Sequence, residues 1–396
     1  MSKDGSAEVK SPLAGSPPGL SHLAPLDGLR GVAVLLVIFA QTPFILEWPA
    51  TRALQDMALR LSLGHFGVDL FFVLSGFLIT RILLSDIDTQ GRIGFRNFYI
   101  RRMLRIFPAY LISIAVYLLC FEAKGLWSLL TYTFNIYHPF NPGPHPLENT
   151  WSLSVEEQFY LVWPFLIAAL PRAAGWRVTA FFVPGIALTI AIAIALIVEG
   201  PLAGELIYRS TPVRMMSLSL GAALAYRELA GRPLPERACW LLMVGGVSIL
   251  AMGTWLRARG LIDAQGDFQV LATFGFTLVS AGVVALILAP SGAFAPHLQS
   301  WLTARWLRAV GKISYGLYIY RSLILYLLGI PLHHSQVHGA PALLVAAFLL
   351  LSFGLAALSY HVVEAPILRL KSRLTGAGEK EGASPEAALQ PIVANR

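Results

Sequence analysis

The sequence predicts an all-α polytopic membrane protein of about ten transmembrane helices, and three observations support this fold class. Only 13% of the 396 residues are charged, whereas a soluble globular domain has about 25%. Hydrophobic residues make up 56% of the chain, and the mean hydropathy is +0.64. Apolar runs of membrane-spanning length recur from residue 28 to residue 364 without a long polar gap. Most of the surface therefore does not face water.

Ten segments have the roughly 20 mostly apolar residues that a spanning helix needs. We expect these helices at 28–47, 62–84, 103–121, 152–170, 178–198, 208–229, 238–256, 268–289, 309–330 and 341–363. A shorter apolar stretch near 126–137 is expected to belong to an outer loop, with a re-entrant path as the alternative. The polar ends, 1–25 and 371–396, are predicted to be disordered cytoplasmic tails around a membrane domain at 26–370.

Lysine and arginine indicate the orientation of the helices. If ten helices alternate in direction, the arginine-rich segments all fall on one side of the membrane, namely 81–105, 171–177, 227–237, 305–312 and the flank after 363. The loops expected on the other side, 122–150, 199–207 and 331–340, are poor in both residues. Both termini are therefore predicted to be cytoplasmic. The net charge of +8 has the same origin, so it does not indicate nucleic-acid binding.

Arginines near the cytoplasmic side form the first candidate set. Arg30 lies early in the first helix, and Arg102 and Arg105 lie where the third helix begins. Arg102 and Arg105 are three residues apart, so they share a helix face. Guanidinium groups bind phosphate through paired hydrogen bonds. The alternative interpretation, given about even odds, is that each arginine reflects membrane topology alone.

Three carboxylates and one arginine, predicted nearer the outer side, form the second set. Asp69 lies in the second helix, Glu156 and Glu157 in the fourth, and Arg214 in the sixth. Ionisable groups inside a membrane are costly and are functional candidates by default. Because neighbours on a helix are offset by about 100°, at most one of Glu156 and Glu157 would face a given site. The alternative role is an interhelical ion pair with Arg214.

Gln41 and Arg321 complete the candidates. Gln41 follows Arg30 by eleven residues, which places both on nearly the same face about 16 Å apart. Arg321 lies near the middle of the ninth predicted helix and needs a buried partner or a water-filled cavity. A structural ion pair and a direct catalytic role are equally compatible with its position. The outer loop contains His333, His334 and His338, but no further ligand is evident and we expect no metal.

Several strings resemble one family. They are LDGLRGVAVLLVIFAQ (26–41), GVDLFFVLSGFLIT (67–80), FYIRRMLRIFPAY (98–110), TWSLSVEEQFYLVWP (150–164), GKISYGLYIY (311–320) and SYHVVEAPI (359–367). In this order they are similar to the signatures of the acyltransferase-3 group of membrane acyltransferases, which O-acetylate carbohydrates. The resemblance covers 26–367. Each string alone is weakly specific, but the ordered set is highly specific.

The resemblance implies a ten-helix protein of the bacterial inner (plasma) membrane with no bound cofactor. It implies acyl-CoA, usually acetyl-CoA, as a cytoplasmic donor substrate and a hydroxyl of a saccharide or glycolipid as acceptor. Carried over by position, the residues that serve the donor or its phosphates are Arg30, Arg102 and Arg105. Those near the reacting groups or the acceptor are Asp69, Glu156 and Glu157.

The chain departs from the family pattern at Gln41 and Arg321, where family members typically have histidines. Glutamine cannot accept a proton at neutral pH, whereas histidine can. General-base catalysis contributes about 10²–10⁴-fold, so the usual route would be slow. Three hypotheses follow: an active O-acyltransferase with another base, a catalytically impaired relative that binds ligands or partners, and a transporter. The family motifs and the lack of duplicated halves disfavour the transporter.

Overall fold

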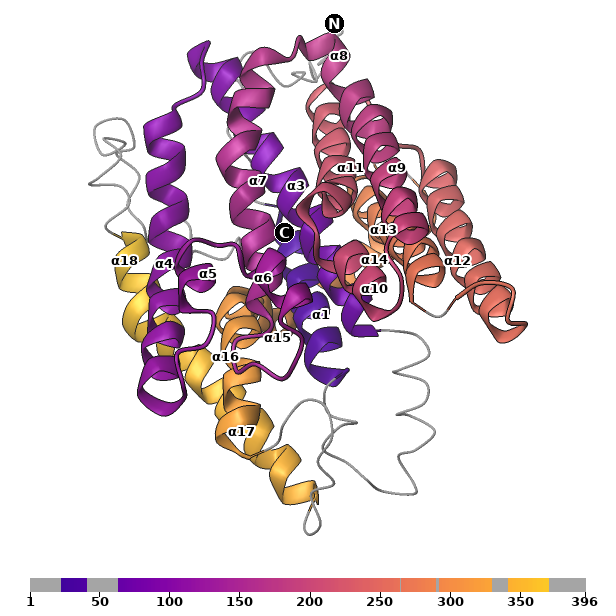
Figure 1. Cartoon of the computed structure of the whole chain (residues 1–396). Helices are drawn as coiled ribbons and strands as arrows, with labels where there is room; N and C mark the ends of the chain where they lie inside the picture. Colours follow the sequence, from indigo (N-terminus) through magenta and orange to yellow (C-terminus); the bar gives the residue numbers. More distant parts are fainter. Residues whose placement is uncertain (1–22, 41–62, 264, 290–291, 330–340, 370–396) are drawn as a thin grey trace, which may run out of the picture.

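The computed structural model describes residues 23–40, 63–263, 265–289, 292–329 and 341–369 (Figure 1). Within these ranges the chain forms helices and no strand, as the predicted fold class requires. The helices are α1 (Ala24–Phe39), α3 (Leu63–Gln90), α4 (Phe95–Cys120), α5 (Leu126–Leu130), α6 (Phe134–Phe140), α7 (Thr150–Ala169), α8 (Arg172–Arg177), η3 (Val178–Phe182), α9 (Val183–Ile197), α10 (Pro201–Arg209), α11 (Thr211–Leu229), α12 (Glu236–Ala258), α13 (Gly266–Leu288), α14 (Ala295–Leu302), α15 (Arg305–Lys312), α16 (Ser314–Leu327), α17 (Pro341–Ser359), η4 (Tyr360–Glu364) and α18 (Ala365–Arg369).

Six helices of the described residues are long and apolar enough to cross a membrane. They are Leu63–Gln90, Phe95–Cys120, Arg172–Ile197, Glu236–Ala258, Gly266–Leu288 and Leu343–Leu368. Helical structure also lies over the other four predicted segments, as α1, α7, α11 and α16. Three of those four, α1, α7 and α16, line the interior cavities described below. The count of ten spanning helices stays a prediction.

Helix α3 forms the centre of the bundle. Its most apolar window is 83% buried, compared with 17% for α12, and it packs against α1, α7, α11 and α13. Glycines allow the closest of these approaches. A Cβ atom at Gly76 would lie 1.8 Å from the carbonyl oxygen of Leu218, and one at Gly221 would lie 2.0 Å from that of Val73. Only glycine at both positions permits this α3–α11 contact.

The segment between α4 and α7 turns back into the bundle, which agrees with the re-entrant alternative. Figure 1 shows α5 and α6 alongside α4 rather than beyond its end. The side-chain amide of Gln158 donates to the Tyr132 carbonyl at 2.8 Å and to Asn135 Oδ1 at 3.0 Å. Asn149 and Thr150, just before and at the start of α7, are buried. Helix α7 therefore begins inside the protein, not at its surface.

Two contacts bring three of the arginine-rich segments to one end of the bundle. Arg172, at the start of α8, forms an ion pair with Asp88 near the end of α3. Arg81 pairs with Glu228 at 3.0 Å, near the end of α11. These three segments therefore lie at the same end of the bundle, as the positive-inside pattern predicts. That this face is cytoplasmic stays a prediction.

Some predicted features lie outside the described residues. These include Gln41, the histidine-containing loop 331–340 and nearly all of both tails. Residues 24 and 25, which we assigned to the first tail, already belong to the first turn of α1.

Candidate functional site

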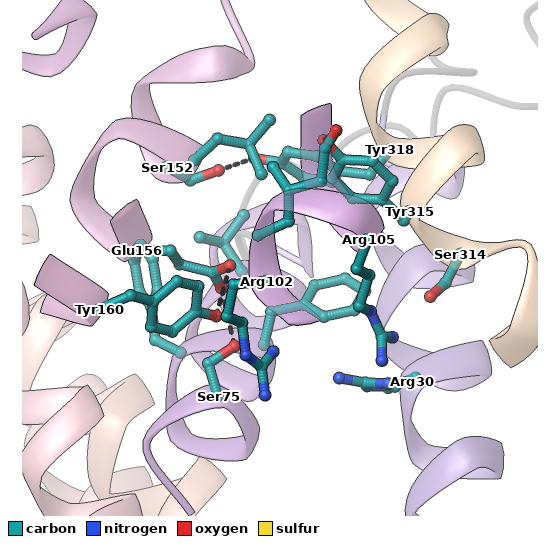
Figure 2. Close-up of a pocket in the computed structure, with 15 residues that line it drawn as sticks. Arg30, Ser75, Arg102, Arg105, Ser152, Glu156, Tyr160, Ser314, Tyr315 and Tyr318 are labelled. Atoms are coloured by element: carbon teal, nitrogen blue, oxygen red, sulfur yellow. Dashed lines mark hydrogen bonds between the residues drawn. The ribbon is translucent and has the colours of Figure 1, made fainter. Parts of the chain in front are cut away.

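Two adjoining cavities lie among α1, α3, α4, α7, α10 and α16. The first cavity encloses about 70 Å³ and is lined from five helices (Figure 2). Its polar lining residues are Arg30 of α1, Ser75 of α3, Arg102 and Arg105 of α4, Ser152, Glu156 and Tyr160 of α7, and Ser314, Tyr315 and Tyr318 of α16.

Three arginines gather at one end of the first cavity. Figure 2 shows the guanidinium groups of Arg30 and Arg105 pointing toward each other, while that of Arg102 lies beside Ser75. Arg102 also lies over the Tyr160 ring, 5.3 Å from its centroid. Among the described residues no carboxylate forms an ion pair with any of the three. The predicted convergence of α1 and α4 arginines is therefore present, and it leaves a concentration of positive charge open to an anion.

Glu156 lies in the same cavity as these arginines. Its carboxylate accepts hydrogen bonds from Ser75 at 2.9 Å and from Tyr160 at 3.1 Å. Glu157 does not line the cavity, and its Oε1 is buried without a hydrogen-bond partner within the described ranges. One of the two neighbours faces the site, as helix geometry requires. Our separation of Glu156 from the arginines by depth was wrong, because α7 begins inside the bundle.

The second cavity is larger, about 330 Å³. This volume falls within the range of small-molecule sites. Its lining comes from α1, α3, α7, α10, α16 and the residues before α7. The residues are Val37, Ala40, Gly64, His65, Val68, Glu148, Asn149, Trp151, Glu205, Tyr208, Arg209, Tyr318, Arg321 and Ser322.

Val68 and Tyr318 line both cavities and so form the wall between them. The Tyr318 hydroxyl lies 2.5 Å from Ser152 Oγ and donates to the Asn149 carbonyl at 3.2 Å. The Asn149 side chain in turn donates to the backbone carbonyls of Tyr318 and Ile319. These bonds hold α16 against the start of α7 and fix the position of the wall.

Arg321 lines the second cavity and lies over the Tyr318 ring, 5.0 Å from its centroid. Its Nε is buried and has no hydrogen-bond partner in the described part of the chain. No carboxylate of that part pairs with it, since Glu148 and Glu205 both contact Arg209, at 2.8 and 2.5 Å. The cavity, rather than a structural ion pair, accommodates Arg321.

Asp69 lies outside the lining of both cavities. Its carboxylate pairs with Arg214 at 3.2 Å and accepts hydrogen bonds from Ser217 at 2.8 Å and Thr277 at 3.1 Å. This is the interhelical ion pair that we considered as the alternative to a catalytic role. Asp69 therefore joins α3, α11 and α13 next to the site.

Sequence reasoning missed His65, Asn149, Tyr208 and Tyr318 as cavity residues. His65 and Asn149 lie just before recognised strings, and Tyr318 lies inside one. Their position beside or inside these strings was the signal that could have identified them as site residues. Gln41 follows the last described residue of the first segment, Ala40, which lines the second cavity.

The two cavities offer different binding groups. The first cavity offers three cations to a phosphorylated ligand. The second offers the aromatic faces of Trp151 and Tyr208 beside polar groups, which suits a ligand with both apolar faces and hydroxyl groups. Only the side chains of Val68 and Tyr318 are common to both walls, so the two sites meet there.

Comparison with known proteins finds relatives that are named O-acetyltransferases. The peptidoglycan O-acetyltransferase OatA of Listeria monocytogenes is 28% identical over 370 residues, which cover 87% of this chain and 56% of OatA. The O-acetyltransferase OatA of Staphylococcus aureus is 29% identical over 374 residues, covering 87% and 57%. YrhL of Bacillus subtilis is 29% identical over 371 residues, covering 87% and 55%. The chain thus spans just over half the length of these relatives.

No solved structure matches the chain. A family model described as an acyltransferase domain, however, matches residues 23–361 and so includes both cavities. Together with the six apolar helices, this match confirms the resemblance found in the sequence strings. The chain is therefore an integral membrane protein that belongs to the acyltransferase-3 family.

Proposed function

We propose that the protein is a membrane O-acyltransferase that moves an acyl group, in the first instance acetyl, from acyl-CoA to a hydroxyl of a saccharide or glycolipid. One observation carries the proposal. Arg30, Arg102 and Arg105 line a cavity without a carboxylate partner among the described residues, and that cavity adjoins a second, polar one. The names of the relatives, O-acetyltransferase and peptidoglycan O-acetyltransferase, support the same reaction.

The donor occupies the first cavity in this proposal. Phosphate groups of CoA bind Arg30, Arg102 and Arg105 from the cytoplasmic side, because guanidinium groups bind phosphate bidentately. The acyl end then extends toward the wall formed by Val68 and Tyr318. The arginine end of the cavity reaches the molecular surface, since Arg105 is exposed, so a long ligand need not be enclosed.

The acceptor occupies the second cavity. The ring faces of Trp151 and Tyr208 provide apolar surface, and Asn149 and Ser322 provide hydrogen-bonding groups. Arg321 faces the wall with an unpaired Nε. Its guanidinium remains protonated, so it stabilises a developing oxyanion rather than acting as a base.

A catalytically impaired relative that binds ligands or partners is the second candidate. The observation that favours it is the presence of Gln41 and Arg321 at positions where the family typically has histidines. Such a protein would retain the arginine-lined cavity for acyl-CoA but transfer the acyl group very slowly.

Turnover by the purified full-length chain in lipid nanodiscs tests the proposal. Radiolabelled acetyl-CoA serves as donor and soluble peptidoglycan fragments as acceptor, and both label transfer and CoA release are followed for the native chain, Gln41→Ala and Gln41→His. An active enzyme transfers label in its native form. No transfer by the native chain, with transfer gained in Gln41→His, would instead establish the impaired relative.

A further inference from the structure

His65 lines the second cavity from the first turn of α3. Its imidazole ring contacts the Tyr208 ring, with centroids 4.2 Å apart and planes tilted by 56°. Arg214 lies over the Tyr208 ring at 4.5 Å and bonds the Tyr208 carbonyl, so the surface against which His65 packs is fixed. The imidazole nitrogens form no hydrogen bond with a described residue and are not sealed from the cavity.

The other ionisable side chains around this cavity are occupied or unsuited to accept a proton. Glu148 and Glu205 pair with Arg209. Arg321 and Arg209 remain protonated at any physiological pH. The hydroxyls of Tyr208 and Tyr318 are weak acids with ordinary pKa values near 10. A neutral imidazole carries a nitrogen lone pair that can accept the proton of a hydroxyl group.

Two observations place His65 near the point where the two substrates would meet. Val68, which forms part of the wall between the cavities, follows His65 by three residues and so lies on the same helix face. A Cβ atom at Gly64 would lie 3.1 Å from Ala40 Cβ. The start of α3 thus packs against the end of α1, and the residue after Ala40 is Gln41, which stands in place of the family histidine.

We propose that His65 is the general base of this protein and supplies from α3 the imidazole that Gln41 lacks. This inference rests on the proposed function. An imidazole nitrogen takes the proton of the acceptor hydroxyl, and the oxygen attacks the thioester carbonyl carbon. The carbon–sulfur bond breaks, and the CoA thiolate takes the proton back from the imidazolium. The products are the O-acyl saccharide and CoA, and His65 returns to its neutral form.

Substitution with chemical rescue tests this role in the nanodisc assay described above. His65→Ala removes the base and leaves a space beside Tyr208, and His65→Gln keeps a hydrogen-bonding group without a base. Both should lose about 10²–10⁴-fold in turnover, the usual contribution of a general base. Added imidazole should restore turnover to His65→Ala and have no effect on the native chain. A merely structural histidine would not respond in this way.

His297→Gln is the matched control, because His297 is exposed and lines neither cavity. It should retain native turnover. Native-like turnover in His65→Gln, or loss in His65→Ala that imidazole does not restore, would overturn the role of His65 while leaving the transferase intact. Absence of turnover in the native chain would instead overturn the proposed function, and the inference with it.

Discussion

Arg30, Arg102 and Arg105 place three positive charges around one small cavity whose remaining walls include Phe71, Phe72 and other apolar side chains. Like charges at close range repel each other more strongly in such surroundings than in water. A bound polyanion removes this repulsion and satisfies the guanidinium donors at the same time. This is a stronger argument for a phosphate site than the i, i+3 spacing of Arg102 and Arg105 alone.

Replacing both Arg102 and Arg105 by Gln should weaken CoA binding by about tenfold for each lost charge-assisted hydrogen-bonding group. The free energy of unfolding should change little, because neither side chain pairs with a described carboxylate. Calorimetric titration of the purified chain with CoA measures the affinity. Arg101→Gln is the control, since Arg101 is adjacent in sequence but does not line the cavity. If the folded double variant binds CoA as tightly as Arg101→Gln does, the two arginines serve topology only.

The charged residues of the first cavity were predictable from the sequence, whereas most residues of the second, Arg321 excepted, were not. Arg30, Arg102, Arg105 and Glu156 are charges within or beside apolar segments, so their position in the sequence already marks them. The second cavity combines residues from helix ends and connections. His65 carries no such mark, because a histidine at the start of an apolar helix can equally be an interfacial residue. Its partner Tyr208 lies on α10, far away in the sequence.

At the scale of helices, one polar cluster holds the centre of the bundle together. The carboxylate of Asp69 on α3 bonds Arg214 and Ser217 of α11 and Thr277 of α13. Arg214 extends the cluster to Tyr208 of α10. His65 packs against the Tyr208 ring, so the cluster links helix packing to the second cavity.

Removing one partner of this buried pair should be more harmful than removing both. Asp69→Leu leaves the Arg214 cation buried without its counter-ion, which lowers the free energy of unfolding by about 3–5 kcal/mol. Arg214→Met likewise leaves the Asp69 carboxylate buried without a counter-ion. The double variant leaves neither charge and should unfold at a higher temperature than either single variant. Heating the detergent-purified proteins and measuring the remaining monodisperse fraction gives the three midpoints. A double variant as unstable as the sum of the two singles would contradict the pairing.

Hydrophobic runs predicted where helices lie, but not where each helix begins relative to the bundle. The segment 268–289 matches α13 within two residues, whereas α3 continues six residues beyond 62–84 and α4 begins eight residues before 103–121. The start of α7 was predicted within two residues in the sequence. The predicted depth of this start, toward the outer side of the bundle, was wrong, because α7 begins inside the protein. That depth depends on Gln158 and Asn149 bonding distant backbone groups, and no local pattern encodes such contacts.

At the scale of the whole molecule, the two ends of the bundle differ in charge and in construction. At one end, the last turns of α3 and the start of α8 are joined by the Asp88–Arg172 ion pair. The connection from α4 to α7 is instead built from α5 and α6, which fold back alongside α4 (Figure 1). An asymmetric bundle of this kind suits a donor that enters from one side and an acceptor that is presented from the other.

Cysteine labelling in intact cells should locate the two ends relative to the membrane. Gln90, at the end of α3, and Pro142, after α6, are both exposed and lie in segments that the arginine pattern assigns to opposite sides. Gln90 is a better labelling site than its neighbour Gly91, whose φ of 71° would strain any side chain. The parent is Cys120→Ser, because Cys120 is exposed and Cys239 is buried. A membrane-impermeant maleimide should label Pro142→Cys in intact cells and Gln90→Cys only after permeabilisation, while the parent stays unlabelled. The opposite result would place the arginine-lined cavity on the outer side, where acyl-CoA is absent, and would remove the basis for a cytoplasmic donor.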